Sequence, residues 1–118
     1  MKRLFATGLV LAGLVSAAAA QSIGGEYTVA GTNHDGTAYE GEATITLVSE
    51  TTCEISWKTG NTTSEGICSR NGDAFAAAYV LEDAVGLVIY KVQSDGSLDG
   101  LWTIQGKEGT GTEKLTPR

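Results

Sequence analysis

Basic residues are scarce in this 118-residue chain, and their scarcity narrows the range of partners. Eight Lys and Arg stand against fourteen Asp and Glu, which gives a formal charge of −6 at neutral pH. Nucleic-acid backbones and anionic lipid surfaces are bound through clustered positive charge. The acidic balance therefore argues against both nucleic acid and membrane docking, and it leaves proteins and small molecules as partners.

Catalytic motifs are missing as well. The chain has no nucleophile elbow, no glycine-rich phosphate loop and no calcium-loop spacing. Its single histidine, His34, precedes Asp35, and such a pair can act as a general base. The surrounding sequence, Asn33-His34-Asp35-Gly36-Thr37, is nevertheless typical of a hairpin turn in which the Asp has a structural role. We predict a protein that is not an enzyme and that uses no cofactor.

The first twenty residues have the pattern of a secretory signal peptide. A basic pair, Lys2-Arg3, is followed by an apolar run to about Val15 and by small residues up to Ala20. An uncleaved membrane span is the alternative, but no polar stop-transfer flank follows the run. We expect export to the periplasm or the cell exterior, and the chain has no second apolar run that would span a membrane.

Residues 21–118 are predicted to form a single small domain with one disulfide. Without the leader the formal charge is −8, from six basic and fourteen acidic residues. Two cysteines in an exported chain, Cys53 and Cys68, favour a disulfide, which would stabilise a domain of this size by roughly 3 kcal/mol. Two thiolates and one histidine make a poor zinc set, so no metal is predicted.

Alternation of apolar and polar residues predicts an all-β fold. No segment after the leader keeps a helical period, and runs with a period of two are separated by turn dipeptides such as Asp-Gly and Asn-Gly. Short connections place neighbours in sequence side by side in the sheet. The predicted strands are 25–31, 37–48, 52–59, 62–70, 73–80, 85–93, 97–105 and 110–116.

Turn lengths predict the register of these strands. The segments 33–37 and 93–97 each suit a three-residue loop with Gly in the left-handed conformation. A two-residue turn is predicted at Asn71-Gly72. A second one at Gly60-Asn61 would place Cys53 opposite Cys68. A four-residue loop closed by Lys58 and Thr63 would bring the two cysteines closer, so the length of this turn stays open at this stage.

The register sorts the side chains onto two faces. One face collects the aromatic residues Tyr27, Tyr39, Trp57, Phe75, Tyr79, Tyr90 and Trp102, together with Gly31, Gly41, Gly66, Gly86 and Gly100. The other face collects the acids Glu40, Glu42, Glu54, Glu65 and Asp99. A sheet of eight strands with one apolar face closes most simply as an antiparallel up-and-down barrel of avidin-like or lipocalin-like architecture. A β-sandwich is the alternative.

The aromatic interior admits two interpretations. Short loops and a small chain favour an interior filled by side chains, whereas barrels of this size can also hold one small ligand. A ligand cavity would be lined by Trp57, Tyr90, Trp102 and Glu113. A four-residue connection from Gly106 to Gly109 would turn Glu113 inward, across from Trp102, where burial raises a carboxyl pKa. The alternative places this carboxylate at the barrel mouth, in solvent.

A set of apolar residues is predicted to face outward on three adjacent strands. Exposed apolar patches of this extent usually mark a contact with a partner or a second layer. We expect the patch to pack against another protein or a second copy of the chain, unless a terminus covers it. The candidate partner surface comprises Ala76, Ala78, Val80, Val85, Leu87, Ile89 and Leu101.

Most of the chain after the leader also resembles a known family. The strings YTVAGTNHDGTAYEGEATI, CEISWKTG, GICSRNGDAFAAAYV, VGLVIY, DGSLDGLWTI and GTGTEKLTP resemble small exported proteobacterial proteins, some of which are labelled fibronectin-binding. The resemblance implies a secreted or periplasmic binding protein whose partner is fibronectin or another protein. A small-ligand carrier that uses the aromatic interior is the alternative function.

Overall fold

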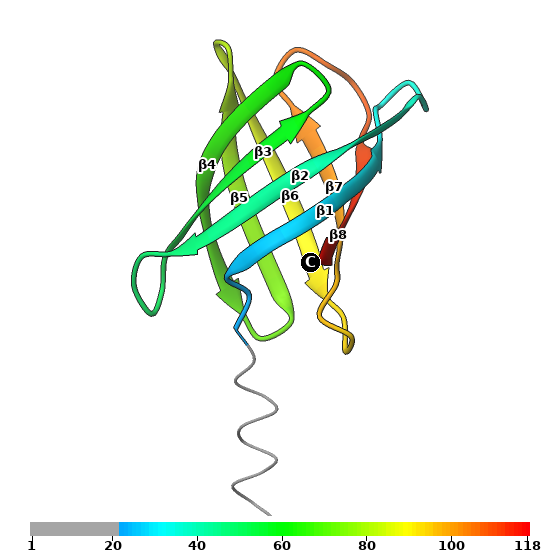
Figure 1. The fold of residues 1–118 in the computed structure, drawn as a ribbon. Coiled ribbons are helices and arrows are strands. Elements are labelled where there is room, and N and C mark those ends of the chain that lie inside the picture. The colour runs from blue at the N-terminus through cyan, green and yellow to red at the C-terminus, as the bar shows by residue number, and fades with distance from the viewer. Residues whose placement is uncertain (1–21) are drawn as a thin grey trace, which may run out of the picture.

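A computed structural model describes residues 22–118, which form one closed β-barrel (Figure 1). The predicted leader, residues 1–20, lies outside the described residues. Each strand begins and ends within one residue of its predicted bounds. The strands are β1 (Gly25–Thr32), β2 (Ala38–Leu47), β3 (Cys53–Thr59), β4 (Thr62–Asn71), β5 (Ala74–Leu81), β6 (Ala84–Val92), β7 (Leu98–Ile104) and β8 (Gly111–Pro117).

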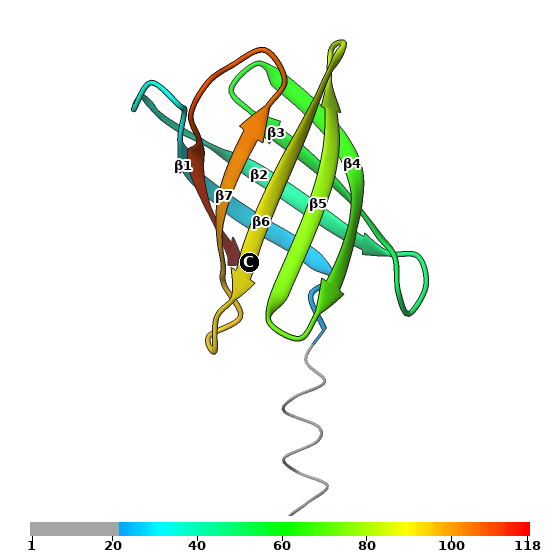
Figure 2. The same ribbon diagram turned by 180° about the vertical axis from the view of Figure 1, so that it is seen from behind.

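The barrel has the predicted up-and-down order. Each strand pairs antiparallel with the next, and β1 pairs with β8 to close the sheet, so the alternative of a sandwich is wrong. Seen from both sides, the strands are tilted around a common axis (Figures 1 and 2). The β1–β2, β3–β4, β5–β6 and β7–β8 connections lie at one end, called here the open end. The other connections lie at the closed end, where β1 begins and β8 finishes.

The register on β3 and β4 is the predicted one. The two strands are joined by the two-residue Gly60-Asn61 turn, and Cys53 lies opposite Cys68. The cysteines form a disulfide with their Cα atoms 4.9 Å apart. The turn that sequence left open therefore has its shorter form, and the disulfide links two neighbouring strands near the closed end.

Two predicted connections are wrong in detail. The β4–β5 turn consists of Gly72 and Asp73 rather than Asn71-Gly72, because Asn71 pairs with Ala74. Gly72 has a φ of 64°, so the glycine takes the first central position of the turn, the arrangement of a type II′ hairpin. The β7–β8 connection spans residues 105–110 instead of 106–109. Each error shifts the pairing by two residues, so every side chain keeps its predicted face.

The closed end is filled by a continuous apolar core. Phe75 and Tyr90 stack with ring centroids 5.5 Å apart, and Ile23 covers this end of the barrel. The Tyr27 hydroxyl donates a hydrogen bond of 2.5 Å to the Ile23 carbonyl. Other fully or nearly fully buried side chains are Val29, Ile45, Ile55, Val88, Leu98 and Leu115.

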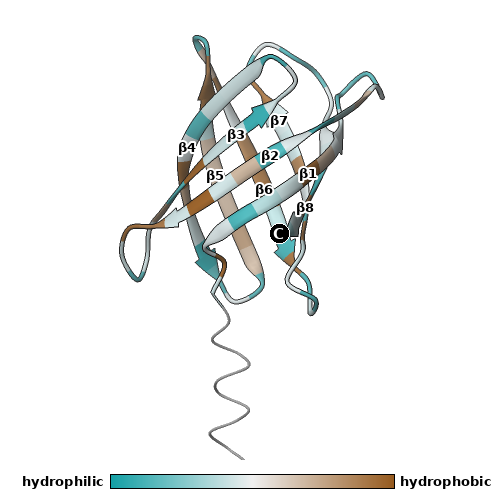
Figure 3. Cartoon of the chain, in the orientation of Figure 1, coloured by the Kyte–Doolittle hydropathy of each residue, from teal (hydrophilic) through white to brown (hydrophobic). Residues whose placement is uncertain are grey.

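The predicted apolar wall does face outward, and it is wider than predicted. Ile89 is 66% exposed, Leu101 lies opposite it, and Leu87 is 52% exposed. On β4, Ile67 lies opposite Ala78 and extends the patch to a fourth strand. Figure 3 shows β5 in brown along much of its length. The outer wall is defined as Ile67, Ala76, Ala78, Val80, Val85, Leu87, Ile89 and Leu101. Within residues 22–118 no helix has the length and apolar character to cross a membrane.

Candidate functional site

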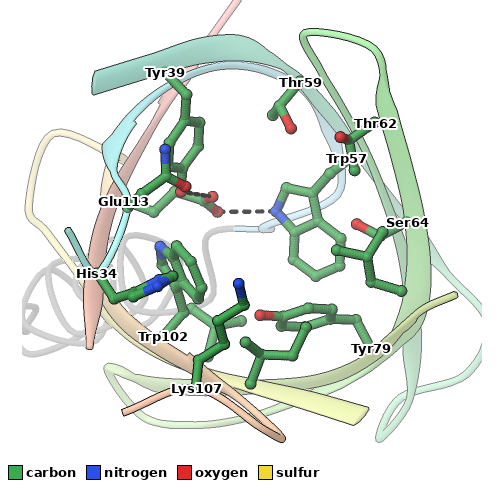
Figure 4. A pocket seen from close by; sticks show the side chains of 14 residues that line it. His34, Tyr39, Trp57, Thr59, Thr62, Ser64, Tyr79, Trp102, Lys107 and Glu113 are labelled. Atoms are coloured by element: carbon green, nitrogen blue, oxygen red, sulfur yellow. Dashed lines mark hydrogen bonds between the residues drawn. The ribbon is translucent and has the colours of Figure 1, made fainter. Parts of the chain in front are cut away.

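A cavity of about 350 Å³ lies inside the open end of the barrel. Its walls are four aromatic side chains, Tyr39 from β2, Trp57 from β3, Tyr79 from β5 and Trp102 from β7, and Glu113 from β8 lies among them (Figure 4). The favoured expectation of a completely filled interior is therefore wrong. The barrel is filled at its closed end and hollow at its open end.

Glycines opposite the rings make this arrangement possible. Four aromatic side chains are each paired with a glycine on the neighbouring strand, and the ring lies over that glycine. A side chain at the glycine would occupy the space that the ring fills. A Cβ added at Gly86 would come within 2.1 Å of Tyr79 Cζ. The cross-strand pairs are Gly31 with Tyr39, Gly86 with Tyr79, Gly100 with Tyr90 and Gly111 with Trp102.

The four cavity rings form two edge-to-face pairs. The Tyr39 and Trp102 centroids are 6.4 Å apart with an interplanar angle of 68°. The Trp57 and Tyr79 centroids are 5.3 Å apart at 63°. Because edge-to-face contacts of this kind stabilise ring positions, each ring is held by a partner as well as by its strand.

Glu113 accepts hydrogen bonds from three of the surrounding side chains. Oε1 accepts from the Tyr39 hydroxyl at 2.7 Å, and Oε2 accepts from Trp57 Nε1 at 2.8 Å and from the Tyr90 hydroxyl. Glu113 is only 8% exposed. Of the two alternatives from sequence, the inward carboxylate is correct and the solvated one is wrong. Glu113 lies opposite Gly100, however, and Trp102 lies opposite Gly111.

The tyrosines around this carboxylate are held in their neutral form. Burial, and then the negative charge of Glu113, raise the pKa of Tyr79 to about 12. The same two causes raise the pKa of Tyr39 and Tyr90 well above the ordinary value. A phenol that keeps its proton remains a hydrogen-bond donor, so Tyr39 and Tyr90 continue to donate to Glu113 as the pH rises.

One buried donor in the cavity lacks a well-formed hydrogen bond. Trp102 Nε1 is shielded from solvent, and no acceptor in residues 22–118 engages it in normal geometry. Buried donors in native proteins are usually satisfied by protein, water or ligand. The N–H group lies against Gly111, where an added Cβ would come within 2.4 Å of Nε1, so it faces the barrel wall rather than the hollow.

The rim of the cavity carries polar side chains from the turns. His34 in the β1–β2 loop contacts the Trp102 ring edge-on, with centroids 6.4 Å apart, and Lys107 comes from the β7–β8 connection. Asp35 does not pair with His34. Its Oδ1 accepts hydrogen bonds from the backbone N–H and hydroxyl of Thr37, which lower the Asp35 pKa. Within residues 22–118, no three His, Cys, Asp or Glu side chains gather as a metal site would require.

The structure brings together most of the cavity residues predicted from sequence. Trp57, Trp102 and Glu113 line the cavity, whereas Tyr90 lies beneath it, 1% exposed, and reaches it only through Glu113. The prediction omitted Tyr39 and Tyr79, although their interior face was predicted. The sequence signal that could have indicated these two residues is an aromatic residue paired with a glycine near the open end. In that combination the ring lies over the glycine and leaves the centre of the barrel unfilled.

Comparisons with known proteins identify the fold and leave the family open. No protein-family model and no curated protein sequence matches the chain. Among solved structures, the redesigned β-barrel mFAP1 bound to DFHBI is 19% identical with a TM-score of 0.69, and the match covers 85% of this chain and 98% of that one.

Two further solved structures have the same architecture. A redesigned β-barrel is 14% identical with a TM-score of 0.70, over 81% of this chain and 91% of its own. A de novo designed fluorescence-activating β-barrel is 14% identical with a TM-score of 0.65, over 80% of this chain and 93% of its own. At these identities the likeness establishes the barrel fold alone.

Proposed function

We propose that the protein binds one small organic molecule in the cavity at the open end and acts as a carrier rather than an enzyme. The observation that supports this proposal is a 350 Å³ hollow lined by four aromatic side chains and one buried carboxylate. Sites for small molecules typically have this size, an apolar and aromatic lining, and a few placed polar groups. The related architecture of mFAP1, described as bound to DFHBI, is consistent with a ligand inside such a barrel.

Tryptophan fluorescence offers a direct test. The chain has two tryptophans, Trp57 and Trp102, and both line the cavity. A ligand in the cavity is expected to change their emission saturably when a panel of small aromatic and heterocyclic molecules is titrated.

A matched pair of variants localises the binding. Ser64 lines the cavity, whereas Thr63 beside it is exposed on the outer face. Ser64→Leu should weaken binding at least about tenfold by filling the hollow, while Thr63→Leu should bind as the wild type does. The proposal fails if no compound gives saturable binding, or if both variants bind as tightly as the wild type.

We propose protein binding through the outer wall as a second candidate function. Its apolar residues lie on four adjacent strands, from β4 to β7, and stay exposed in the isolated barrel. A second copy of the chain is the occupant that we favour, because the apolar wall of one copy can cover the same wall of another through a two-fold interface. Fibronectin is the partner implied by the resemblance of the sequence to labelled proteins.

The mass of the protein in solution tests this candidate. Light scattering of the wild type at rising concentration should show a dimer, and Leu87→Lys with Ile89→Lys should give a monomer. Thr44→Lys, on the exposed part of β2 away from the wall, is the control. A monomer in every case removes the dimer, and immobilised fibronectin then serves to examine the implied partner.

We also propose that the chain is exported and cleaved after Ala20. The leader pattern and the presence of a disulfide are the supporting observations. Intact mass of the protein recovered from a bacterial periplasm or medium should match residues 21–118. Recovery of the full chain from the cytoplasm alone would contradict export.

A further inference from the structure

We infer that the ligand of this cavity is an organic cation, an amine or quaternary ammonium compound whose charged group lies among the four rings and against Glu113. The inference rests on the proposed small-ligand function and specifies the chemical class of the ligand. It follows from the charge on the carboxylate, from the composition of the walls and from the acceptor position that remains open on Glu113.

Among the residues that the structure describes, no cationic side chain forms an ion pair with Glu113, although Lys107 lines the same cavity. All three groups that donate to Glu113, the side chains of Tyr39, Trp57 and Tyr90, are neutral. Ion pairs among residues 22–118 join Arg118 to Glu26 and to Glu42 on the barrel exterior. A buried carboxylate that forms no ion pair favours a cation that enters the same low-dielectric space and contacts it directly.

Glu113 also keeps a free acceptor position. Each carboxylate oxygen can accept about two hydrogen bonds. Oε2 accepts two, from Trp57 and Tyr90, whereas within residues 22–118 the only side chain that donates to Oε1 is Tyr39. Oε1 can therefore accept an ammonium N–H, or face the positive methyl groups of a quaternary nitrogen.

The walls have the composition of a cation-binding aromatic cage. Ring faces of Trp and Tyr attract organic cations, and cages of several rings bind quaternary ammonium groups in other proteins. Figure 4 shows Tyr39, Trp57, Tyr79 and Trp102 on different sides of the hollow, with Glu113 between Tyr39 and Trp102. An apolar neutral ligand would fit the rings but would leave the carboxylate uncompensated.

Hydroxyl groups in the lining suit a ligand that carries an oxygen besides its ammonium group. Thr59, Thr62 and Ser64 line the cavity together with the aromatic side chains. A hydroxyl or carbonyl oxygen on the ligand would bond to these hydroxyl groups while the ammonium group lies against Glu113. Hydroxyalkyl and acyloxyalkyl ammonium compounds are the simplest molecules of this kind.

A variant of Lys107 gives a separate test of whether the ligand is a cation or an anion. It lies at the rim on the β7–β8 connection, and it is exposed. A rim lysine repels a cation and attracts an anion. Lys107→Gln should therefore strengthen binding of a cation about twofold to threefold at low salt and weaken binding of an anion.

The experiment compares isosteres on the complete disulfide-bonded protein. Choline and acetylcholine are titrated by calorimetry and tryptophan fluorescence beside neutral isosteres in which carbon replaces the ammonium nitrogen. We expect each cation to bind at least about tenfold more tightly than its isostere. Glu113→Gln should reduce this preference to about twofold, and Lys107→Gln should increase it.

The possible outcomes separate this inference from the proposed function. If cation and isostere bind equally, or if only neutral or anionic members of the wider panel bind, the cation inference is overturned and the small-ligand function stands. If nothing binds at all, both fail. Should Glu113→Gln not fold, the Lys107→Gln variant decides: weaker cation binding overturns the inference and stronger binding supports it.

Discussion

Glu113 connects strands that are not neighbours in the sheet. From β8 it accepts hydrogen bonds from Tyr39 on β2, Trp57 on β3 and Tyr90 on β6, and so crosses the interior of the barrel. A residue that satisfies three buried donors contributes to stability whatever else it does. The side chain proposed to recognise a ligand therefore also stabilises the fold.

Replacing this carboxylate should cost stability in a graded way. Glu113→Ala leaves three donors without an acceptor and should lower the free energy of unfolding by about 3 kcal/mol or more. Glu113→Gln keeps one acceptor oxygen and should lose about half of that. Urea denaturation measures both values. A loss for Glu113→Ala no larger than that for Glu113→Gln would show that the hydrogen bonds to this residue contribute little.

The raised pKa values of the buried tyrosines predict that the protein loses stability at high pH. Folding raises the pKa of Tyr39, Tyr79 and Tyr90 above their ordinary value near 10, to about 12 for Tyr79. The unfolded chain therefore releases protons first as the pH rises above about 10, and the free energy of unfolding falls. The stability due to Tyr79 is complete below pH 10 and is lost as the pH passes through about 12.

Near-ultraviolet absorbance and urea denaturation from about pH 8 to 11 test this prediction. Phenolate absorbance should rise at higher pH in the native protein than in denaturant, and the denaturation midpoint should fall over the same range. In Tyr79→Phe the fall should be shallower, because one titrating group is gone. Coincident titration of native and denatured protein would contradict the assignment.

At the scale of the elements, three two-residue hairpins share one backbone feature. The first turn residue has a positive φ in each: 59° at Gly60, 64° at Gly72 and 56° at Glu82. Glycine adopts this conformation without strain, whereas a residue with a Cβ does so at a cost of roughly 1 kcal/mol. The β5–β6 hairpin thus repeats the turn of the other two with a less suitable residue.

Glu82→Gly should consequently stabilise the barrel. We expect a gain of about 0.5–1 kcal/mol in the free energy of unfolding, because relief of strain exceeds the added flexibility of the unfolded chain. Glu82→Ala removes the same charge and keeps the Cβ, so it should show no comparable gain. Thermal and urea denaturation compare the two. Equal stabilisation by both would assign the effect to the charge instead.

Turn chemistry also explains how far sequence could predict these elements. The segments around Gly36 and Gly96 specify the same three-residue loop, and Asp35 and Asp95 accept equivalent hydrogen bonds from Thr37 and Ser97. Such local patterns fix both turn length and face. The β4–β5 turn was misplaced because Asn71-Gly72-Asp73 offers two adjacent two-residue turns, and the choice between them depends on pairing along the whole hairpin.

At the scale of the whole molecule, the interior face was predictable but its filling was not. Period-two alternation assigns Tyr39, Tyr79, Trp57 and Trp102 to the inside without giving their height along the barrel axis. Whether the rings meet at the centre depends on strand tilt and on the glycines opposite them. The cavity is thus a property of the closed barrel, and sequence indicated only the inward position of Glu113 and of the rings that line it.

The disulfide should account for a large share of the global stability. Cys53 and Cys68 close a loop with a sequence separation of 15, for which the loss of unfolded-chain entropy stabilises the native state by roughly 3 kcal/mol. We expect the Cys53→Ala, Cys68→Ala double variant to lose about this amount in urea denaturation. Reduced wild type should match it. A loss below about 1 kcal/mol would mean that the unfolded chain is already compact near this hairpin.

The closed end of the barrel is the end at which the molecule can be attached to a support or to a fusion partner. Gly25 and Pro117 both lie at the closed end, where Pro117 pairs with Tyr27, and the cavity opens at the opposite pole. A tether joined at residue 118, or ahead of residue 22, attaches to the same pole and points the opening away from its support. Immobilised on a resin or fused to a carrier domain in either order, the barrel would present the mouth of its cavity to the surrounding solution.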